Sequence, residues 1–497
     1  MLLGPGRILP RLAVTPPSRF GFIPLGPRDS KIWYRRRYPM RKLGLPKKAS
    51  IVFLFCVATM IASPAQTTFT TLANFDGTNG ESPTYVSLVQ GFDGNFYGTT
   101  FEGGTGSCGT VFKITAAGTL TTMHNFVNTD GCLPYPGLVQ ATNGDLYGIT
   151  SAGGAALYGT VFKLTPAGTL TTLHTFCHQS PGCTGGYQPL GTLVQASNGI
   201  FYGTTAQGGS SRRGTVFKIT AGGTLTTLHS FNGTDGEYPI AGLVQASNGD
   251  FYGTTSSGGA SGNGTVFKIT ADGTLTTLHN FHGTDGAQPL AAPIQAADGE
   301  FYGTTELGGA NNLGTVFKIA SGGALTTLHS FDGTDGEYPV AALVQATDGN
   351  FYGTTSVYDG TVFEITPSGT LTTLHAFDGT DGSNVSDGLV QATDGTFYGT
   401  TYAGGTDNYG TVFSISVGLG PFVETLPTSG KAGATVIILG NNLTGATAVS
   451  FNGKTTVFTV VSSTEIKTTV PTAATTGTVE VTTPSGALKS NVSFRVP

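Results

Sequence analysis

The stretch YPIAGLVQASNGDFYGTTSSGGASGNGTVFKITADGTLTTLHNF, residues 238–281, determines how the rest of the chain is interpreted. It contains four short runs rich in Val, Ile, Phe, Tyr and Thr, which are the residues that favour β-strands. Asn-Gly and Asp-Gly pairs lie between the runs, and tight hairpin turns favour them because they tolerate positive φ. No segment of the chain keeps a helical period with caps, so we expect almost no helix. The stretch therefore predicts a sheet of four antiparallel strands.

The same sequence pattern occurs seven times along the chain. The Tyr of FYGTT or its near copies stands at positions 97, 147, 202, 252, 302, 352 and 398, so the period is 50 residues apart from one gap of 55 and one of 46. The motif GTVF follows each copy, and LVQ or PIQ precedes each copy. Four-stranded units at this period are typical of β-propellers. We therefore predict an all-β fold with a seven-bladed β-propeller over residues 66–417.

The first and last copies are incomplete in complementary ways. The last copy ends at GTVFSIS, residues 410–416, without a fourth strand, while TTLANF, residues 70–75, stands before the first copy and matches a fourth strand. We expect the N-terminal strand to pair beside residues 410–416 and to close the propeller, which leaves no open blade. Within FYGTT, Phe and Tyr are expected to point to opposite faces and to pack between blades, rather than to form an aromatic ligand ring.

Charge is distributed unevenly. Residues 1–65 hold 12 basic residues and one acid, and the remainder holds 12 basic and 28 acidic residues, a net charge of −16, which argues against a nucleic-acid partner. Residues 40–65 combine a basic start, an apolar run of 12 residues and the small residues Ser63 and Ala65. This pattern predicts a signal peptide cut after Ala65 and no membrane span in the mature chain. Residues 1–39 are interpreted as an upstream extension or a disordered leader.

Export would place the chain where disulfides form. Four cysteines follow the expected cleavage site, and they allow three pairings. Cys108 and Cys132 lie in two loops expected on one face of the first unit, and Cys177 and Cys183 flank a five-residue insertion. We therefore expect the bonds Cys108–Cys132 and Cys177–Cys183, with four free thiols as the alternative.

The segment GTVFKLTPAGTLTTLHTF, residues 159–176, resembles the Gloeo/Verruco (GloVer) tandem repeat of the choice-of-anchor type, and the resemblance covers about residues 69–416. It implies an exported bacterial protein of propeller type, and it transfers no catalytic residue. Residues 421–497 alternate short strands with Gly, Pro and Asn turns, which predicts a small β-sandwich. Their segments LPTSGKAGATVIILGNNL, VSFNG and TGTVEVTTPSG resemble the IPT/TIG immunoglobulin-like domain. This resemblance implies a spacer or adhesion module.

Two sets of repeated polar residues are of types that can bind metal ions. Six histidines share one position on the fourth strand, and we expect them to face solvent in separate blades, too far apart to share an ion: His124, His174, His229, His279, His329 and His375. Acidic residues recur in the connection to the next blade, where turn chemistry is favoured over a Ca²⁺ site: Asp76, Asp130, Asp235, Asp285, Asp335 and Asp381. We therefore predict no metal and no cofactor.

The loop between the second and third strands differs in every copy, while the other turns barely change. In a propeller this loop shares a face with the connection between blades, and variation on one face of a fixed scaffold is typical of binding surfaces, although unconstrained drift would give the same pattern. The ligand-binding candidates on this face are Glu102, Tyr158, Arg212, Arg213, Asn312, Asp407 and Tyr409.

These observations predict a non-enzymatic binding or adhesion protein. It would be secreted or held at the cell surface or in the periplasm, and as a monomer it would present the loop face to a glycan or protein ligand. No HExxH, GxSxG, P-loop or CxxC motif supplies a catalytic set, and no catalytic residue is predicted. The alternatives are a polysaccharide lyase or hydrolase, and a purely structural protein of the cell envelope.

Overall fold

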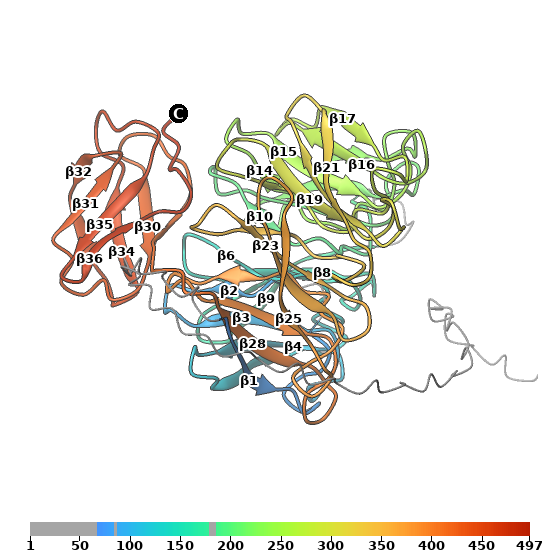
Figure 1. Ribbon diagram of the computed structural model, residues 1–497, viewed down its shortest axis with the longest axis horizontal. Helices are drawn as coiled ribbons and strands as arrows, with labels where there is room; N and C mark the ends of the chain where they lie inside the picture. The colour runs from blue at the N-terminus through green and yellow to red at the C-terminus, as the bar shows by residue number, and fades with distance from the viewer. Residues whose placement is uncertain (1–66, 84–86, 178–184) are drawn as a thin grey trace, which may run out of the picture. The chain divides into compact units, whose positions relative to one another are not determined.

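The computed structural model describes residues 67–83, 87–177 and 185–497, and the regular secondary structure in these ranges is all β-strand (Figure 1). Residues 68–416 form seven four-stranded antiparallel sheets that resemble propeller blades, and residues 424–489 form two more sheets. This confirms the all-β prediction. Across the described part of the chain, no helix has the length and apolar character needed to cross a membrane. The expected signal peptide and leader, residues 1–65, lie outside the described residues.

Each of the first six sheets uses four consecutive strands. In order of hydrogen bonding they are β2 (Val89–Gln90), β3 (Phe96–Thr100), β4 (Thr110–Ile114) and β5 (Leu120–Asn125); β6 (Val139–Gln140), β7 (Leu146–Thr150), β8 (Thr160–Leu164) and β9 (Leu170–Thr175); β10 (Val194–Gln195), β11 (Phe201–Thr205), β12 (Thr215–Ile219) and β13 (Leu225–Ser230); β14 (Val244–Gln245), β15 (Phe251–Thr255), β16 (Thr265–Ile269) and β17 (Leu275–Asn280); β18 (Ile294–Gln295), β19 (Phe301–Thr305), β20 (Thr315–Ile319) and β21 (Leu325–Ser330); β22 (Val344–Gln345), β23 (Phe351–Thr355), β24 (Thr361–Ile365) and β25 (Leu371–Ala376).

The seventh sheet combines the two ends of the repeat region. Its order is β1 (Thr68–Asn74), β28 (Thr411–Ser416), β27 (Phe397–Thr401) and β26 (Val390–Gln391). β1 is antiparallel to β28, with Thr68 opposite Ser416 and Asn74 opposite Thr411. The N-terminal strand therefore pairs with the last strand of the final repeat, as the sequence predicts.

The second strand of every sheet is buried along its whole length. Its alternating side chains reach the two neighbouring sheets: Phe251 stacks on Tyr202 of the sheet before, with ring centroids 4.0 Å apart, and Tyr252 stacks on Phe301 of the sheet after, at 3.9 Å. This confirms that Phe and Tyr pack between sheets. The glycine of FYGTT makes room for this packing, because a Cβ on Gly253 would lie 2.7 Å from Phe267 of the third strand.

Hydrophobic clusters link consecutive sheets. Each of seven clusters draws buried side chains from two sheets that follow one another, and one of them joins Phe96 and Phe112 of the first sheet to Tyr398 and Val412 of the last. Burial of an aromatic side chain contributes about 2–3 kcal/mol, and a stacked aromatic pair adds about 1 kcal/mol. Packing between consecutive sheets therefore stabilises the repeat region along its whole length.

The first strand of each sheet is short. Of the run GLVQA, residues 242–246, only Val244 and Gln245 pair with the second strand, opposite Tyr252 and Phe251. The glutamine adds a bond that the pattern did not reveal. Its Oε1 accepts a backbone N–H from the preceding sheet at 2.7–3.2 Å in all seven copies, including a bond from Thr393 N to Gln90 that links the last sheet to the first.

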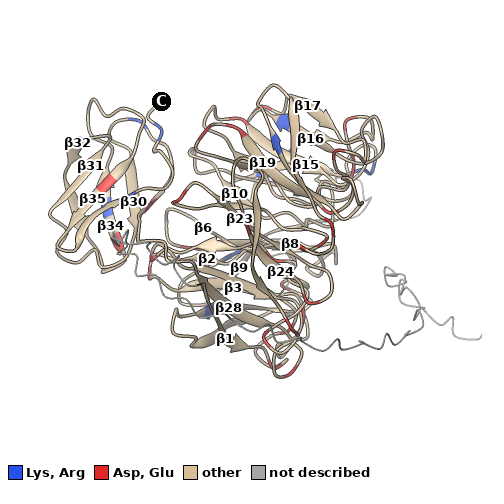
Figure 2. Cartoon of the chain, in the orientation of Figure 1, with Lys and Arg blue, Asp and Glu red and all other residues tan. Residues whose placement is uncertain are grey.

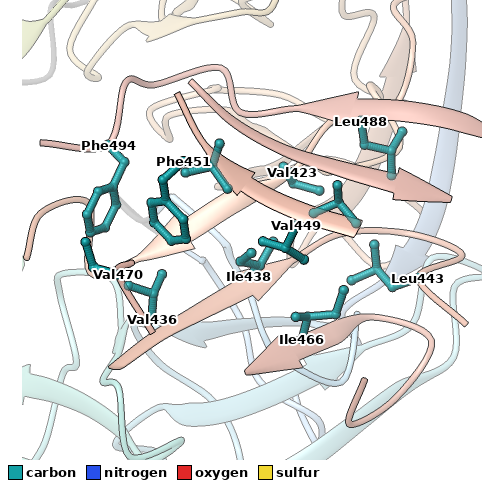
Figure 3. Close-up of a cluster of buried hydrophobic side chains, with 12 residues drawn as sticks. Val423, Val436, Ile438, Leu443, Val449, Phe451, Ile466, Val470, Leu488 and Phe494 are labelled. Carbon is teal, nitrogen blue, oxygen red and sulfur yellow. The ribbon is translucent and has the colours of Figure 1, made fainter. Parts of the chain in front are cut away.

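Residues 424–489 form a β-sandwich. One sheet contains β29 (Glu424–Leu426), β30 (Thr435–Leu439), β34 (Glu465–Thr469) and β33 (Phe458–Val460), and the other contains β32 (Lys454–Thr456), β31 (Ala448–Phe451), β35 (Val479–Thr483) and β36 (Gly486–Lys489). Figure 3 shows the shared core, in which Val436, Ile438 and Ile466 of one sheet face Val449 and Phe451 of the other.

Deletion of residues 67–76 should destabilise the repeat region. It removes β1, exposes the backbone edge of β28, and removes Phe75, which is fully buried and packs edge-on against Phe112 at 5.2 Å. We expect a lower melting temperature and aggregation, measured by calorimetry and light scattering. A truncated protein with the melting temperature and solubility of the parent would contradict this prediction.

Candidate functional site

The variable loops and the connections between sheets form one continuous surface. Each connection lies between two loops: Glu237 pairs through its backbone with Ser257 of the following loop, and Tyr238 N donates to the carbonyl of Arg213 in the preceding loop at 3.0 Å. Equivalent bridges join Glu81 to Glu102 and Tyr187 to Gln207. This surface, which we call the loop face, is where the sequence placed the candidate ligand-binding residues.

Three of the seven candidates lie close together. Tyr158 of the β7–β8 loop packs edge-on against Tyr187 of the next connection, with ring centroids 5.5 Å apart. Burial raises the pKa of Tyr187, the charge of Arg212 in the β11–β12 loop offsets part of this rise, and Tyr158 and Tyr238 add to it. Arg213, next to Arg212, forms an ion pair with Glu237. We call this group the tyrosine–arginine patch: Tyr158, Tyr187, Arg212, Arg213, Glu237 and Tyr238.

The patch presents the ring of Tyr238 and the cation of Arg212 to solvent, while Tyr158 and Tyr187 are half-buried. Tyr238 is 41% exposed, and its backbone and that of Arg212 take positive φ values of 53° and 59°. The Arg213 side chain is 45% exposed and lies over Gly233. No salt bridge involves Arg212 in the ranges that the structure describes. Because the connection holds the tyrosines by backbone bonds, the patch is preformed.

The other four candidates lie apart from the patch. Glu102 is on the first loop, Asn312 on the fifth, and Asp407 and Tyr409 are exposed on the last, where Tyr409 lies over Gly77. Asn312 Oδ1 accepts Gly308 N of its own loop at 3.1 Å, and the ligand-binding role of Asn312 stays a prediction. Asn408 holds the last loop in the same way. Asn312 therefore shapes a loop.

A carboxyl pair on the first loop was missed by the sequence analysis. Glu81 and Glu102 face each other across a backbone bridge, and their side chains are in hydrogen-bond contact. Burial, and then the neighbouring charge of Glu102, raise the pKa of Glu81. Glu81, Tyr187 and Glu237 occupy one position of the connection, at which the other copies hold Cys132, Ala287, Glu337 and Ser383. A comparison of the connections, like the one made for the loops, would have found all three.

The disulfide Cys108–Cys132 ties the first loop to the connection that follows it, with Cα atoms 4.5 Å apart. It is the bond expected for these two loops. Cys183 lies outside the described residues, so the bond Cys177–Cys183 stays a prediction.

The expectation that the repeated histidines face solvent is wrong. In five copies the histidine Nε2 lies 2.6–3.0 Å from the Oδ2 of the aspartate six residues later, and the histidine side chains are only 17–22% exposed. The cause is a β-bulge in the fourth strand, which places His229 opposite Val216 and beneath the connection. The sixth, His174, has a pKa lowered by burial, and Gly185 stands where the aspartate would be.

The aspartate loops are turns, as favoured from the sequence. Asp332 Oδ1 accepts the N–H and the hydroxyl of Thr334 at 2.8 and 2.6 Å, and Asp335 Oδ1 accepts Asp332 N at 3.1 Å. Asp76 caps Thr78 in the same way. Figure 2 shows acidic residues on many of these connections and few basic ones, so Arg212 and Arg213 stand out against an acidic background.

Comparison with known families identifies both parts of the chain. The family model of the Gloeobacter/Verrucomicrobia repeat matches residues 58–195 and 188–413, and that of the IPT/TIG domain matches residues 422–496. No curated protein matches the chain.

Solved structures resemble the chain at low identity. They include a fungal alcohol oxidase of the AA5 family in complex with copper (TM-score 0.50, 14% identity, 84% of this chain and 98% of that chain), virginiamycin B lyase from Staphylococcus aureus (0.47, 12%, 71% and 99%) and a gluconolactonase from Xanthomonas campestris (0.39, 11%, 72% and 92%). At these identities the likeness concerns the fold alone.

The carboxyl pair predicts a pH-dependent effect of Glu81→Gln. Because the folded-state pKa of Glu81 is raised, the folded protein binds more protons than the unfolded one, and stability decreases as pH rises above about 4.3, the ordinary pKa of glutamic acid. Glu81→Gln should therefore raise the melting temperature at pH 7, and the gain should disappear near pH 4. Glu337→Gln is the matched control, because Glu337 holds the same position without a facing acid. Equal melting temperatures of parent and Glu81→Gln at pH 7 would refute the prediction.

Proposed function

Because the chain belongs to the Gloeobacter/Verrucomicrobia repeat family, we propose that it is an exported, non-enzymatic binding protein whose seven sheets form a closed propeller. In this proposal the tyrosine–arginine patch binds glycans that carry carboxylate groups. The C-terminal IPT/TIG domain acts as a spacer or a second adhesive surface, and the protein works as a monomer.

Closure of the propeller is supported by contacts between the first and last sheets. The first and last sheets share a hydrophobic cluster and the bond from Thr393 N to Gln90. The same two features are present between each of the six remaining pairs of consecutive sheets. The pairing of β1 with β28 supplies the fourth strand of the last sheet. Seven equivalent interfaces for seven sheets is the count that a closed seven-bladed ring requires.

Export is supported by the disulfide and by the leader. Disulfides such as Cys108–Cys132 form and persist mainly in oxidising compartments outside the cytosol. Residues 40–65 have the pattern of a signal peptide cut after Ala65. The protein would then reside outside the cell, on its surface or in the periplasm. A partner at the cell exterior follows from that location.

The patch is the observation that carries the binding proposal. The exposed ring of Tyr238 and the half-buried rings of Tyr158 and Tyr187 give a rigid surface on which the apolar face of a sugar ring can pack. The guanidinium of Arg212 has planar donors that suit a carboxylate. Because the chain after residue 65 carries a net charge of −16, an exposed arginine among tyrosines is a local exception. Together these groups favour an acidic polysaccharide over a neutral one.

A polysaccharide-acting enzyme is the second candidate, favoured by one observation. Glu81 and Glu102 form a carboxyl pair in which one pKa is raised, and such pairs can donate and accept protons. A lyase or hydrolase would lose turnover in Glu102→Gln while keeping its binding. In the binding proposal, no polysaccharide is cleaved by the parent protein.

Binding can be tested on an array of acidic and neutral polysaccharides. We expect acidic ones to bind, and Arg212→Asn to weaken binding at least about tenfold, which corresponds to roughly one lost charge-assisted contact. Asparagine suits the positive φ of this position, as Asn312 and Asn408 do in their loops, so the loop should keep its shape. Tyr358→Asn is the matched control, because Tyr358 holds the same position with φ 56° and is 87% exposed on another sheet. Equal binding by the parent and Arg212→Asn would refute the proposed role of the patch.

Closure can be tested by comparing two glutamines. Gln90→Ala removes the acceptor for Thr393 N, and Gln245→Ala removes the acceptor for Ser197 N. In a closed ring both should lower the free energy of unfolding by about 1–2 kcal/mol, since each leaves an N–H without its partner. Urea denaturation measures the two values. A cost for Gln245→Ala with none for Gln90→Ala would indicate an open array.

A further inference from the structure

One connection on the loop face gathers three metal-binding side chains. His279 at the end of β17, and His282 and Asp285 in the connection that follows, each offer one ligand atom, and these atoms all lie within 4.8 Å of one another. Asp285 Oδ2 is 2.8 Å from His279 Nε2 and 3.6 Å from His282 Nδ1. Ligand atoms around a tetrahedral zinc ion lie about 3.3 Å apart, since zinc–nitrogen and zinc–oxygen bonds are about 2.0–2.1 Å long. The two observed spacings lie on either side of this value.

His282 is the residue that distinguishes this connection from the others. The His–Asp pair occurs in five copies, but the position three residues after the histidine is Asn232, Asp332 or Asp378 in three of them, and there the side chain caps the following threonine. Here an imidazole replaces that cap, and its side chain is 59% exposed. The connection thus exchanges a turn-forming side chain for a third potential ligand.

The backbone of the connection holds the three groups in place. His282 N donates to Asp285 Oδ1 at 2.8 Å, which orients the carboxylate so that Oδ2 faces both imidazoles. Gly283 N donates to Gly286 O at 3.0 Å, and the Asp285 carbonyl accepts hydroxyls of Thr315 and Thr327 from the next sheet at 3.4 Å. The His279 ring packs edge-on against Phe281 at 5.2 Å. Few side chains would have to reorganise to bind an ion.

We propose that His279, His282 and Asp285 bind one divalent transition-metal ion of the zinc class. Two imidazoles and one carboxylate are ligands that suit zinc rather than calcium, which prefers oxygen alone. The ion would displace the proton now shared between His279 and Asp285, and water would complete the coordination. The site is independent of the tyrosine–arginine patch, since it uses a different connection and none of the patch residues.

The experiment is a titration of the purified protein, free of any polyhistidine tag, with ZnCl₂ by isothermal calorimetry. We expect one zinc ion per chain. The variant His282→Asn carries the residue type found at the equivalent position 232, and it should weaken zinc binding at least about tenfold. Zinc should also raise the melting temperature of the parent more than that of His282→Asn. Because His282 is exposed, the variant should melt like the parent without zinc.

A reciprocal variant tests whether the ligand set is sufficient. Asp332→His adds an imidazole beside the pair His329–Asp335, in a connection where Leu313 rather than a charged residue neighbours Gly333. The expected stoichiometry is two zinc ions per chain. The proposal is overturned if the parent does not bind zinc, if parent and His282→Asn bind it equally, or if Asp332→His leaves the stoichiometry unchanged.

Discussion

One glutamine side chain in each repeat joins its sheet to the sheet before, and the short first strand depends on this bond. That strand is only two residues long, so its backbone offers few hydrogen bonds of its own. The glutamine side chain supplies two further hydrogen bonds. Its Oε1 accepts an N–H of the neighbouring sheet, and its Nε2 donates to a carbonyl of its own turn, as Gln245 does to Gly249 at 3.2 Å. The aromatic stacks between second strands then bury the adjoining surface. The glutamine fixes the position of one sheet on the next, and the aromatic rings exclude water from the surface between them.

A scaffold repeated so closely makes its exceptions informative. The second strands and the glycine turns serve packing in every copy, so a residue that departs from the pattern on the loop face is not needed for the fold. The tyrosine–arginine patch and His282 are both departures of this kind. At the position of Arg212 the other copies hold Ser, Leu, Gly, Asn or Tyr, and the positive φ shared by Arg212, Asn312 and Asn408 indicates that the backbone conformation does not change with the side chain.

The sequence predicts what depends on local patterns and misses what depends on register. Strand order, the pairing of the N-terminal strand, the burial of FYGTT and the bond Cys108–Cys132 all follow from period, turn residues and loop position. The His–Asp pairs do not, because a bulge opposite Val216 changes the direction of the histidine and no propensity signals a bulge there. Tyr187 and Glu81 were missed because they lie in connections, and the bridges that bring them to the loops are contacts between segments separated in the chain.

The pairing of Thr68 with Ser416 also constrains the order in which the protein can be built. A chain that emerges from a ribosome or a translocation pore presents β1 first, yet its partner arrives almost 350 residues later. The first six sheets can form as they emerge, since each uses consecutive strands, but the seventh must wait for the end of the repeat region. Until then β1 is an unpaired strand and the growing array is open at both ends, a state prone to association with other chains. The topology therefore allows six sheets to form in the order of synthesis, whereas the seventh requires both ends of the repeat region, and a chaperone would be most useful at that step.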